Sequence, residues 1–218
     1  MSIHLERVLP ADIEKRSFEI ITAELGDRKI PADREAVVKR VIHTTADFEY
    51  ADTLCFSENA VQKGIEALKN GATIVTDTKM AWSGVSKPSL QKLGGEAHCF
   101  ISDSDVAETA RKNGTTRAVA SMDKAVSLGD NTIFAIGNAP TALVRLCELI
   151  REGAIHPKLV IGVPVGFVNV VESKELIMQE DVPFIVARGR KAAAMLRRPS
   201  ATRCFTKHAE GYCKQNEQ

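Results

Sequence analysis

The sequence predicts a single α/β domain built on a mostly parallel β-sheet, with helices on both faces and a helical N-terminus. Short runs rich in β-branched residues alternate with stretches of helical periodicity along most of the chain. The predicted strands are apolar throughout, as in ATIVT at 72–76, and such strands are typical of sheets buried on both faces. No linker, low-complexity segment or internal repeat divides residues 1–218, so we expect one domain.

Two helices are expected before the first strand. Apolar residues recur at roughly helical spacing from 13 to 25 and stop at Gly26-Asp27. The second helix is expected to begin near Pro31, because proline is favoured in the first turn of a helix. The apolar residues from Val37 to Ile42 then form its buried stripe.

Strands and helices alternate through the rest of the chain, and turn residues such as Asn70-Gly71 and Asn113-Gly114 separate them. We expect strands at 52–56, 72–76, 97–101, 132–136, 159–163 and 184–187. We expect helices at 58–69, 89–93, 103–112, 116–128, 141–152, 170–179 and 190–198, followed by an irregular tail from about 199.

Composition excludes several classes of protein. The 218 residues include 29 Lys and Arg against 28 Asp and Glu, and this balance argues against a dedicated nucleic-acid binder. Aromatic residues make up only 5%, with Trp82 the single tryptophan, which argues against a stacking platform for single strands.

The compartment is predicted from what the sequence lacks. No apolar run approaches the 18 or more residues of a membrane span, and the N-terminus has no signal-peptide core. The five cysteines are an odd, scattered set without a CxxC pair, which indicates reduced thiols. We therefore expect a cytoplasmic protein that binds neither nucleic acid nor a membrane.

A parallel sheet predicts where a ligand binds, because ligands lie outside the carboxyl ends of the strands. The loops at that edge are residues 77–79, 103–105, 137–140, 162–166 and 188–190. The Gly turn at 137–140 either holds an anion on backbone N–H groups or simply begins the next helix. The glycines and proline at 162–166 require a special backbone path, for which a tight turn is the favoured explanation.

Arg40 and His43 are the strongest catalytic candidates. They are three residues apart, so they project from one side of the second helix, and Ser17 on the first helix is placed to face them. An arginine binds a carboxylate through two parallel hydrogen bonds, and a histidine donates or accepts a proton near neutral pH. From spacing alone, a surface helix with incidental charges is the favoured interpretation.

Weaker candidates lie elsewhere. Arg117 begins a predicted helix, where a cation is not the choice that the helix dipole favours, and Lys79 follows a strand end; each suggests an anionic partner or a solvated side chain. Cys204, His208 and Cys213 offer three soft ligands where zinc usually takes four, so we expect a loosely ordered tail and no metal site.

Several long segments in order resemble the precorrin-8X methylmutases of cobalamin biosynthesis. The resemblance runs from about residue 13 to about residue 192. It rests on IEKRSFEII (13–21), VVKRVIHTTADFEYADTLCFS (37–57), GATIVTDTKMAWSGV (71–85), AIGNAPTALVRLCELI (135–150), LVIGVPVGFVNVVESKELI (159–177) and ARGRK (187–191).

The resemblance implies an isomerase that moves a methyl group from C11 to C12 of precorrin-8X or cobalt-precorrin-8. It implies an α/β homodimer with the site near the subunit interface and a polycarboxylate tetrapyrrole as substrate. The family's catalytic histidine falls on His43, and its substrate-binding positions fall on Ser17, Arg40 and Arg117. Lys79 is added as a further cation for the carboxylates.

The chemistry that follows needs no cofactor, because a methyl shift within one molecule requires no redox group, metal or external donor. It requires the ring to be held in the tautomer from which migration is easy, and we expect His43 to supply or relay the proton. The main alternative is a non-catalytic corrinoid-binding or channelling protein. Two others are a methyltransferase using S-adenosylmethionine and a nucleotide-binding protein built on residues 137–141.

Overall fold

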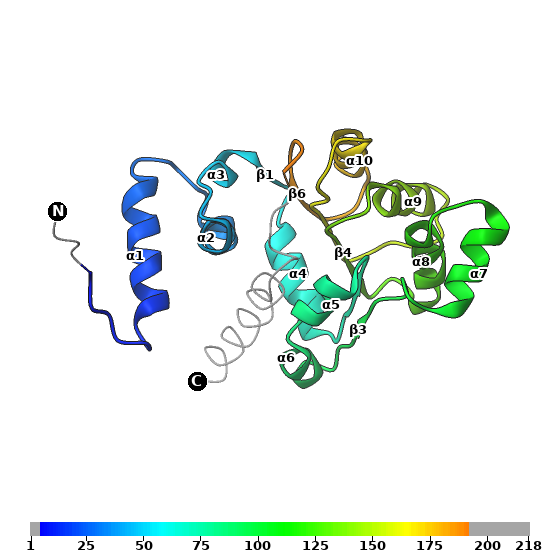
Figure 1. Ribbon diagram of the computed structural model, residues 1–218, viewed down its shortest axis with the longest axis horizontal. Helices are drawn as coiled ribbons and strands as arrows, with labels where there is room; N and C mark the ends of the chain where they lie inside the picture. Colours follow the sequence, from blue (N-terminus) through cyan, green and yellow to red (C-terminus); the bar gives the residue numbers. More distant parts are fainter. Residues whose placement is uncertain (1–4, 192–218) are drawn as a thin grey trace.

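The computed structural model describes residues 5–191 and contains a six-stranded sheet of order β1-β6-β5-β4-β2-β3 (Figure 1). The strands are β1 Leu54–Phe56, β2 Thr73–Thr76, β3 Ala97–His98, β4 Thr132–Ile136, β5 Leu159–Gly162 and β6 Phe184–Ala187. Neighbouring strands pair in parallel except β1, which runs antiparallel to β6 at one edge. The predicted mostly parallel sheet is confirmed.

Helices cover both faces of this sheet. They are α1 Ile13–Leu25, α2 Ala32–Thr45, α3 Tyr50–Thr53, α4 Ala60–Lys69, α5 Lys79–Gly84, α6 Lys87–Lys92, α7 Ser104–Asn113, α8 Arg117–Ala125, α9 Pro140–Arg151 and α10 Val170–Ile177. Strand β4 shows why two layers are needed, because all five of its residues are buried. Ile133 and Ala135 join the core with α2 and α4, while Phe134 and Ile136 join the core with α8 and α9.

The helical N-terminus forms one end of the molecule. Helix α1 packs against α2 and stands beyond it, away from the sheet, whereas α7 and α8 lie at the opposite end of the long axis (Figure 1). Only Ile21 and Leu25 of α1 are buried. Within residues 5–191, no helix combines the length and apolar character needed to cross a membrane.

The structure differs from the predictions at four places. Residues 50–53 form α3, so β1 begins at Leu54 and not at 52, and α5 was not expected at all. Strand β3 ends at His98 and not at 101. Beside it, Trp82 Nε1 donates to Ala97 O and Lys79 Nζ donates to Cys99 O, both at 2.8 Å. Of the last helix expected at 190–198, Arg190 and Lys191 are not helical, and the remainder lies outside the described residues, as do Cys204, His208 and Cys213.

A buried carboxylate joins the ends of two central strands. Asp77 follows β2, is 1% exposed, and accepts hydrogen bonds from the N–H groups of Gly137 (3.0 Å), Asn138 (2.7 Å) and Ala139 (2.7 Å) after β4. Burial raises the pKa of Asp77, and the three N–H groups oppose that rise because they favour the ionised form. This carboxylate therefore fixes the loop between β4 and α9.

The Asp77→Asn variant is expected to lose roughly 2–3 kcal/mol of unfolding free energy, because an amide presents N–H groups where the loop needs an acceptor. Urea denaturation measures this loss. Asp130→Asn is the control, because exposed Asp130 accepts one backbone hydrogen bond, from His156 N at 2.8 Å, and should cost under about 1 kcal/mol. Equal losses in the two variants would contradict the role assigned to Asp77.

Candidate active site

Helices α1 and α2 bring Ser17, Arg40 and His43 into one region, and Phe18 links them. The imidazole of His43 stacks on the Phe18 ring, with centroids 5.3 Å apart and planes inclined by 9°. The Arg40 guanidinium lies over the same ring, 4.7 Å from its centroid. One phenyl ring thus orients both predicted functional side chains, while Ser17 precedes it on α1.

Glu14 provides the second link between the two helices. Its Oε1 accepts a hydrogen bond from Arg40 Nη2 at 2.8 Å. The Arg40 side chain is only 18% exposed and that of Glu14 is 56% exposed, so the ion pair lies at the rim of the helix contact. The guanidinium therefore combines partial burial with a carboxylate partner, which suits it to binding carboxylates.

Ser17 is partly buried, and its hydroxyl donates to the carbonyl of Ile13 at 2.9 Å. This is the usual bond of a serine to the preceding helical turn. To donate to a substrate, the hydroxyl must rotate away from that carbonyl; as an acceptor it can act where it stands.

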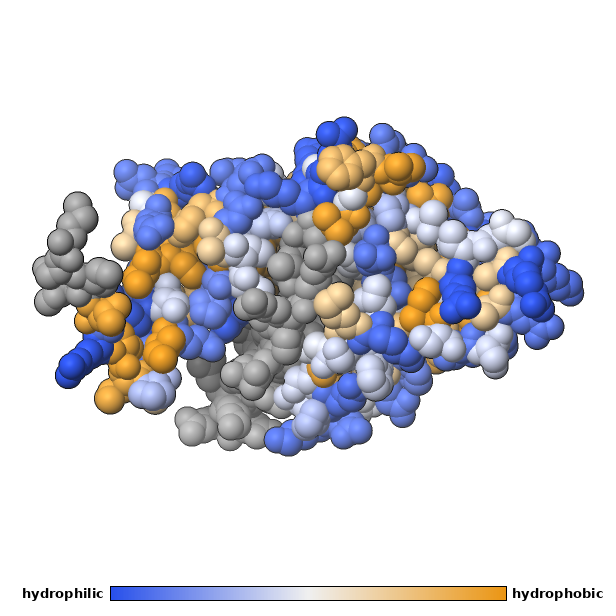
Figure 2. Space-filling model, in the orientation of Figure 1, coloured by the Kyte–Doolittle hydropathy of each residue, from blue (hydrophilic) through white to orange (hydrophobic). Residues whose placement is uncertain are grey.

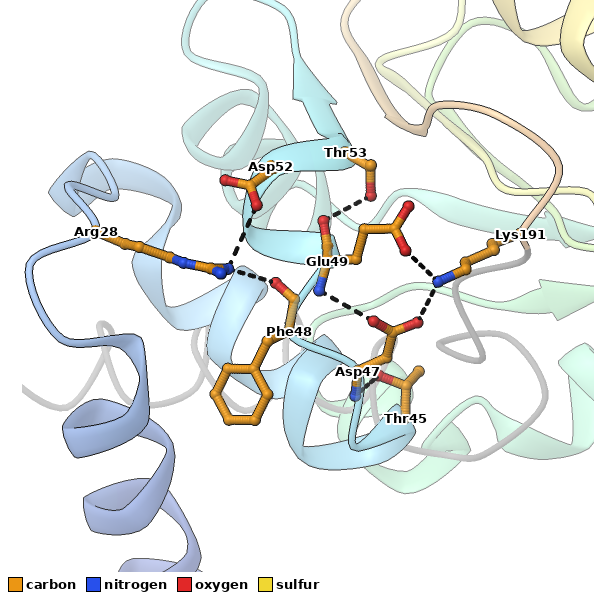
Figure 3. A network of polar contacts seen from close by, with 8 residues as sticks. All are labelled: Arg28, Thr45, Asp47, Phe48, Glu49, Asp52, Thr53 and Lys191. Carbon is orange, nitrogen blue, oxygen red and sulfur yellow. Dashed lines mark hydrogen bonds and ion pairs between the residues drawn. The ribbon is translucent and has the colours of Figure 1, made fainter.

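The turn that follows α2 is tied to the segment after β6 (Figure 3). Lys191 Nζ donates to Asp47 Oδ2 at 2.8 Å and also contacts Glu49 Oε2. The hydrogen bond from Lys191 holds the pKa of Asp47 below its usual range. Asp47 N–H in turn donates to Thr45 Oγ1 at 3.2 Å, so the tie reaches the last residue of the His43 helix.

Lys79 and Arg117 are not brought to His43 within the chain. Lys79 begins α5, where its ammonium donates to Cys99 O at 2.8 Å and lies 5.5 Å from the Trp82 ring centroid. Arg117 is exposed at the start of α8, at the far end of the molecule from α1 (Figure 1). It lines an open hollow of about 600 Å³ beside α7, together with residues such as Arg111. Their roles as substrate contacts stay predictions.

For the loop at 137–140 the sequence left two alternatives, an anion site on backbone N–H groups or simply the start of the next helix. The N–H groups of this loop bind an anion, as one alternative proposed, but that anion is the chain's own Asp77 carboxylate. Sequence reasoning missed Glu14 and Phe18 as partners of the α2 residues. The available signal was their spacing, since residues four apart share one face of a helix.

Comparisons with known proteins identify the family of this chain. A family model described as precorrin-8X methylmutase matches residues 12–196. The cobalt-precorrin-8 methylmutase of Priestia megaterium is 49% identical over 86% of this chain and 83% of its own length. The precorrin-8X methylmutase of Pseudomonas aeruginosa is 36% identical over 84% of this chain and 89% of its own length.

A solved structure agrees as well. The precorrin-8X methyl mutase of Thermus thermophilus superposes with a TM-score of 0.82 at 38% identity, covering 92% of this chain and 98% of that one. The match of family model, sequence and fold extends over nearly all described residues and includes Ser17, Arg40, His43 and Arg117. The chain belongs to the precorrin-8X methylmutase family, a family of isomerases in cobalamin biosynthesis.

Proposed function

We propose that this protein moves the methyl group from C11 to C12 of precorrin-8X or its cobalt-containing form, giving hydrogenobyrinate or cobyrinate. The observation that carries the proposal is the arrangement of His43 and Arg40 around Phe18 in a chain of this family. The reaction is an intramolecular shift formally described as a 1,5-sigmatropic migration. It changes no oxidation state and takes no group from a second molecule, so no cofactor is proposed.

His43 is the proposed proton donor or relay. Its ring plane is set by the stack on Phe18, so the imidazole nitrogens have a fixed direction before substrate arrives. A proton delivered to the macrocycle selects the tautomer from which the methyl group migrates. Arg40 holds a carboxylate arm of the ring beside this imidazole, and the substrate arm competes with Glu14 for the guanidinium.

The exposed face of α1 supports a homodimer. Leu9, Ile13 and Ile20 are 71%, 53% and 40% exposed, and Figure 2 shows apolar surface at the end of the molecule that α1 forms. Ser17 falls between Ile13 and Ile20 at helical spacing, so the proposed substrate contact lies along this face. A contiguous apolar face marks a contact surface, and we propose a second copy of the chain as its partner.

A dimer also accounts for Arg117. Within one chain Arg117 begins α8, and α8 packs in a different core cluster from α2, the helix of His43. In a two-fold dimer that sets α8 of one subunit against α1 and α2 of the other, the Arg117 side chain of one subunit would reach the His43 site of the other. We propose that each active site is completed in this way by the second subunit.

The cytoplasm is the proposed location. Cys55, Cys99 and Cys147 form no disulfide among the described residues, which fits a reducing compartment. The substrate is a polycarboxylate, and neither nucleic acid nor a membrane is proposed as a partner.

The His43→Ala variant is expected to lower kcat about 10²–10⁴-fold, the usual contribution of one general acid, with product affinity changed by less than about fivefold. Product absorption spectra measure turnover, and calorimetry with hydrogenobyrinate measures binding. His156→Ala, at an exposed position, is the control and should match wild type. Turnover of His43→Ala within threefold of wild type would refute the role proposed for His43. Wild-type protein that binds hydrogenobyrinate without turning over substrate would favour the non-catalytic corrinoid-binding alternative.

The cobalt-containing substrate is expected to give the higher kcat/KM, because the Priestia relative named for the cobalt form shares more residues with this chain than the Pseudomonas relative named for the metal-free form. Anaerobic assays with precorrin-8X, with and without cobalt, measure the ratio. A higher kcat/KM for the metal-free form would assign the protein to the other branch.

A mixture of His43→Ala and Arg117→Ala subunits is expected to regain about a quarter of wild-type activity after subunit exchange, because half of the dimers are mixed and each holds one intact site. Each variant alone serves as the inactive reference. Activity no higher than that of the separate variants would show that Arg117 does not act across the interface.

A further inference from the structure

A fully buried lysine lies in α10, outside the group of residues used so far. Lys174 is 0% exposed, whereas lysines are almost never fully buried without dedicated partners. Burial lowers its pKa to about 8, which reflects the cost of removing an ammonium from water. An apolar side chain would avoid that cost, so the lysine must be explained by what its ammonium binds.

The ammonium of Lys174 binds backbone, not a carboxylate. Nζ donates to the carbonyl oxygens of Gly189 at 2.7 Å and of Lys191 at 2.9 Å. The intervening carbonyl, that of Arg190, accepts from Gly166 N–H at 3.4 Å. Gly189 has a φ of +81°, a conformation that glycine adopts without strain. Three successive carbonyls are thus held, and the backbone path of the segment after β6 is fixed.

The side chain of the same segment reaches the end of the His43 helix. Lys191 Nζ contacts Asp47 and Glu49 in the turn after α2, as Figure 3 shows. That turn contains Ala46, whose φ is +53°, and Ala46 is the one positive-φ residue in the described chain that is neither glycine nor asparagine. A turn with this strain needs outside contacts to hold it. The two residues that Lys191 contacts lie four and six residues after His43.

We propose that Lys174 is a positioning residue: it holds the backbone at 189–191 so that Lys191 secures the turn ending α2, and with it the orientation of His43. The proposal rests on the function proposed above for His43. Lys174 touches no reacting group in this scheme and acts through the two backbone carbonyls and Lys191.

Nuclear magnetic resonance of the histidine rings tests this proposal without substrate. The chain has five histidines, and the His43 signal is identified by its loss in His43→Ala. Because this ring stacks on Phe18, its ring protons are sensitive to the placement of the two rings. In Lys174→Met and in Lys191→Met, the His43 signal is expected to shift or broaden, while those of His98 and His156 stay in place.

The matched control is Lys124→Met. Lys124 also joins two carboxylates, those of Asp103 and Asp105 at 2.8 and 2.7 Å, but it lies on α8 at the other end of the molecule. Its removal should leave the His43 signal unchanged. If Lys174→Met does not give folded protein, the His43 signal of Lys191→Met tests the proposal. This variant removes the contact between the 189–191 segment and Asp47 at a side chain that is half-exposed.

Activity gives the second readout. We expect Lys174→Met to lower kcat about tenfold with KM within about threefold, as misplacement of a catalytic group does. The double variant with Lys191→Met should be no worse than Lys174→Met alone, because both remove one connection. Any of three results would overturn the proposal. The His43 signal stays unmoved in the folded variants, all histidine signals shift alike, or the losses in kcat of the two variants are additive. A wild-type protein that turns over no precorrin-8X would instead refute the proposed function, and the resonance measurement would still judge the role of Lys174.

Discussion

A buried ion must be surrounded by hydrogen-bond partners, and two buried ions of opposite sign shape the carboxyl edge of this sheet. Asp77 gathers three N–H groups of the loop after β4, and Lys174 gathers two carbonyls of the segment after β6. Each ion restricts its chain segment to one backbone conformation. Ligands of parallel sheets bind at this edge, so these two residues fix the backbone conformation of loops next to the expected ligand site.

The helix pair α1–α2, which carries the proposed catalytic residues, needs such an anchor because α1 is poorly held by the core. Helix α1 buries only Ile21 and Leu25 and stands away from the sheet (Figure 1), so its position depends on α2. Ile21 and Leu25 share a core cluster with the buried residues of α2, and Phe18 adds its contacts with Arg40 and His43. Contacts that orient the proposed functional side chains therefore also help to hold the helix pair together. A second subunit covering the exposed face of α1 would stabilise the pair further.

The sequence predicted most of the fold because the buried strands carry their own signal. Strands such as TIFAI are apolar in every position, and only a sheet covered on both sides accepts them. Helix α5 and the early end of β3 were missed. Lys79 and Trp82 of α5 donate to the carbonyls of Cys99 and Ala97, and the local sequence pattern gives no signal of contacts with residues so distant along the chain. Spacing found Arg40 and His43 for the opposite reason: residues three apart on a helix are neighbours wherever the helix packs. Lys174 could not be found, since a lysine between acidic residues is typical of an exposed helix face.

The pairing of cations also explains how a nearly neutral chain receives a polyanionic ring. Arg40 is paired with Glu14, and Arg188 is held by Glu175 through bonds of 2.8 and 2.9 Å. The protein thus carries its binding cations already neutralised, which keeps the net charge at +1. If Arg40 binds the substrate as proposed, binding exchanges the carboxylate of Glu14 for one of the substrate, so the Coulomb attraction alone would contribute little to affinity. Affinity would then depend on geometry, because a rigid ring with several carboxylate arms meets several guanidinium groups at once. A flexible or singly charged acid would gain too little binding free energy to displace Glu14. Selectivity for the macrocycle follows from this exchange more than from charge.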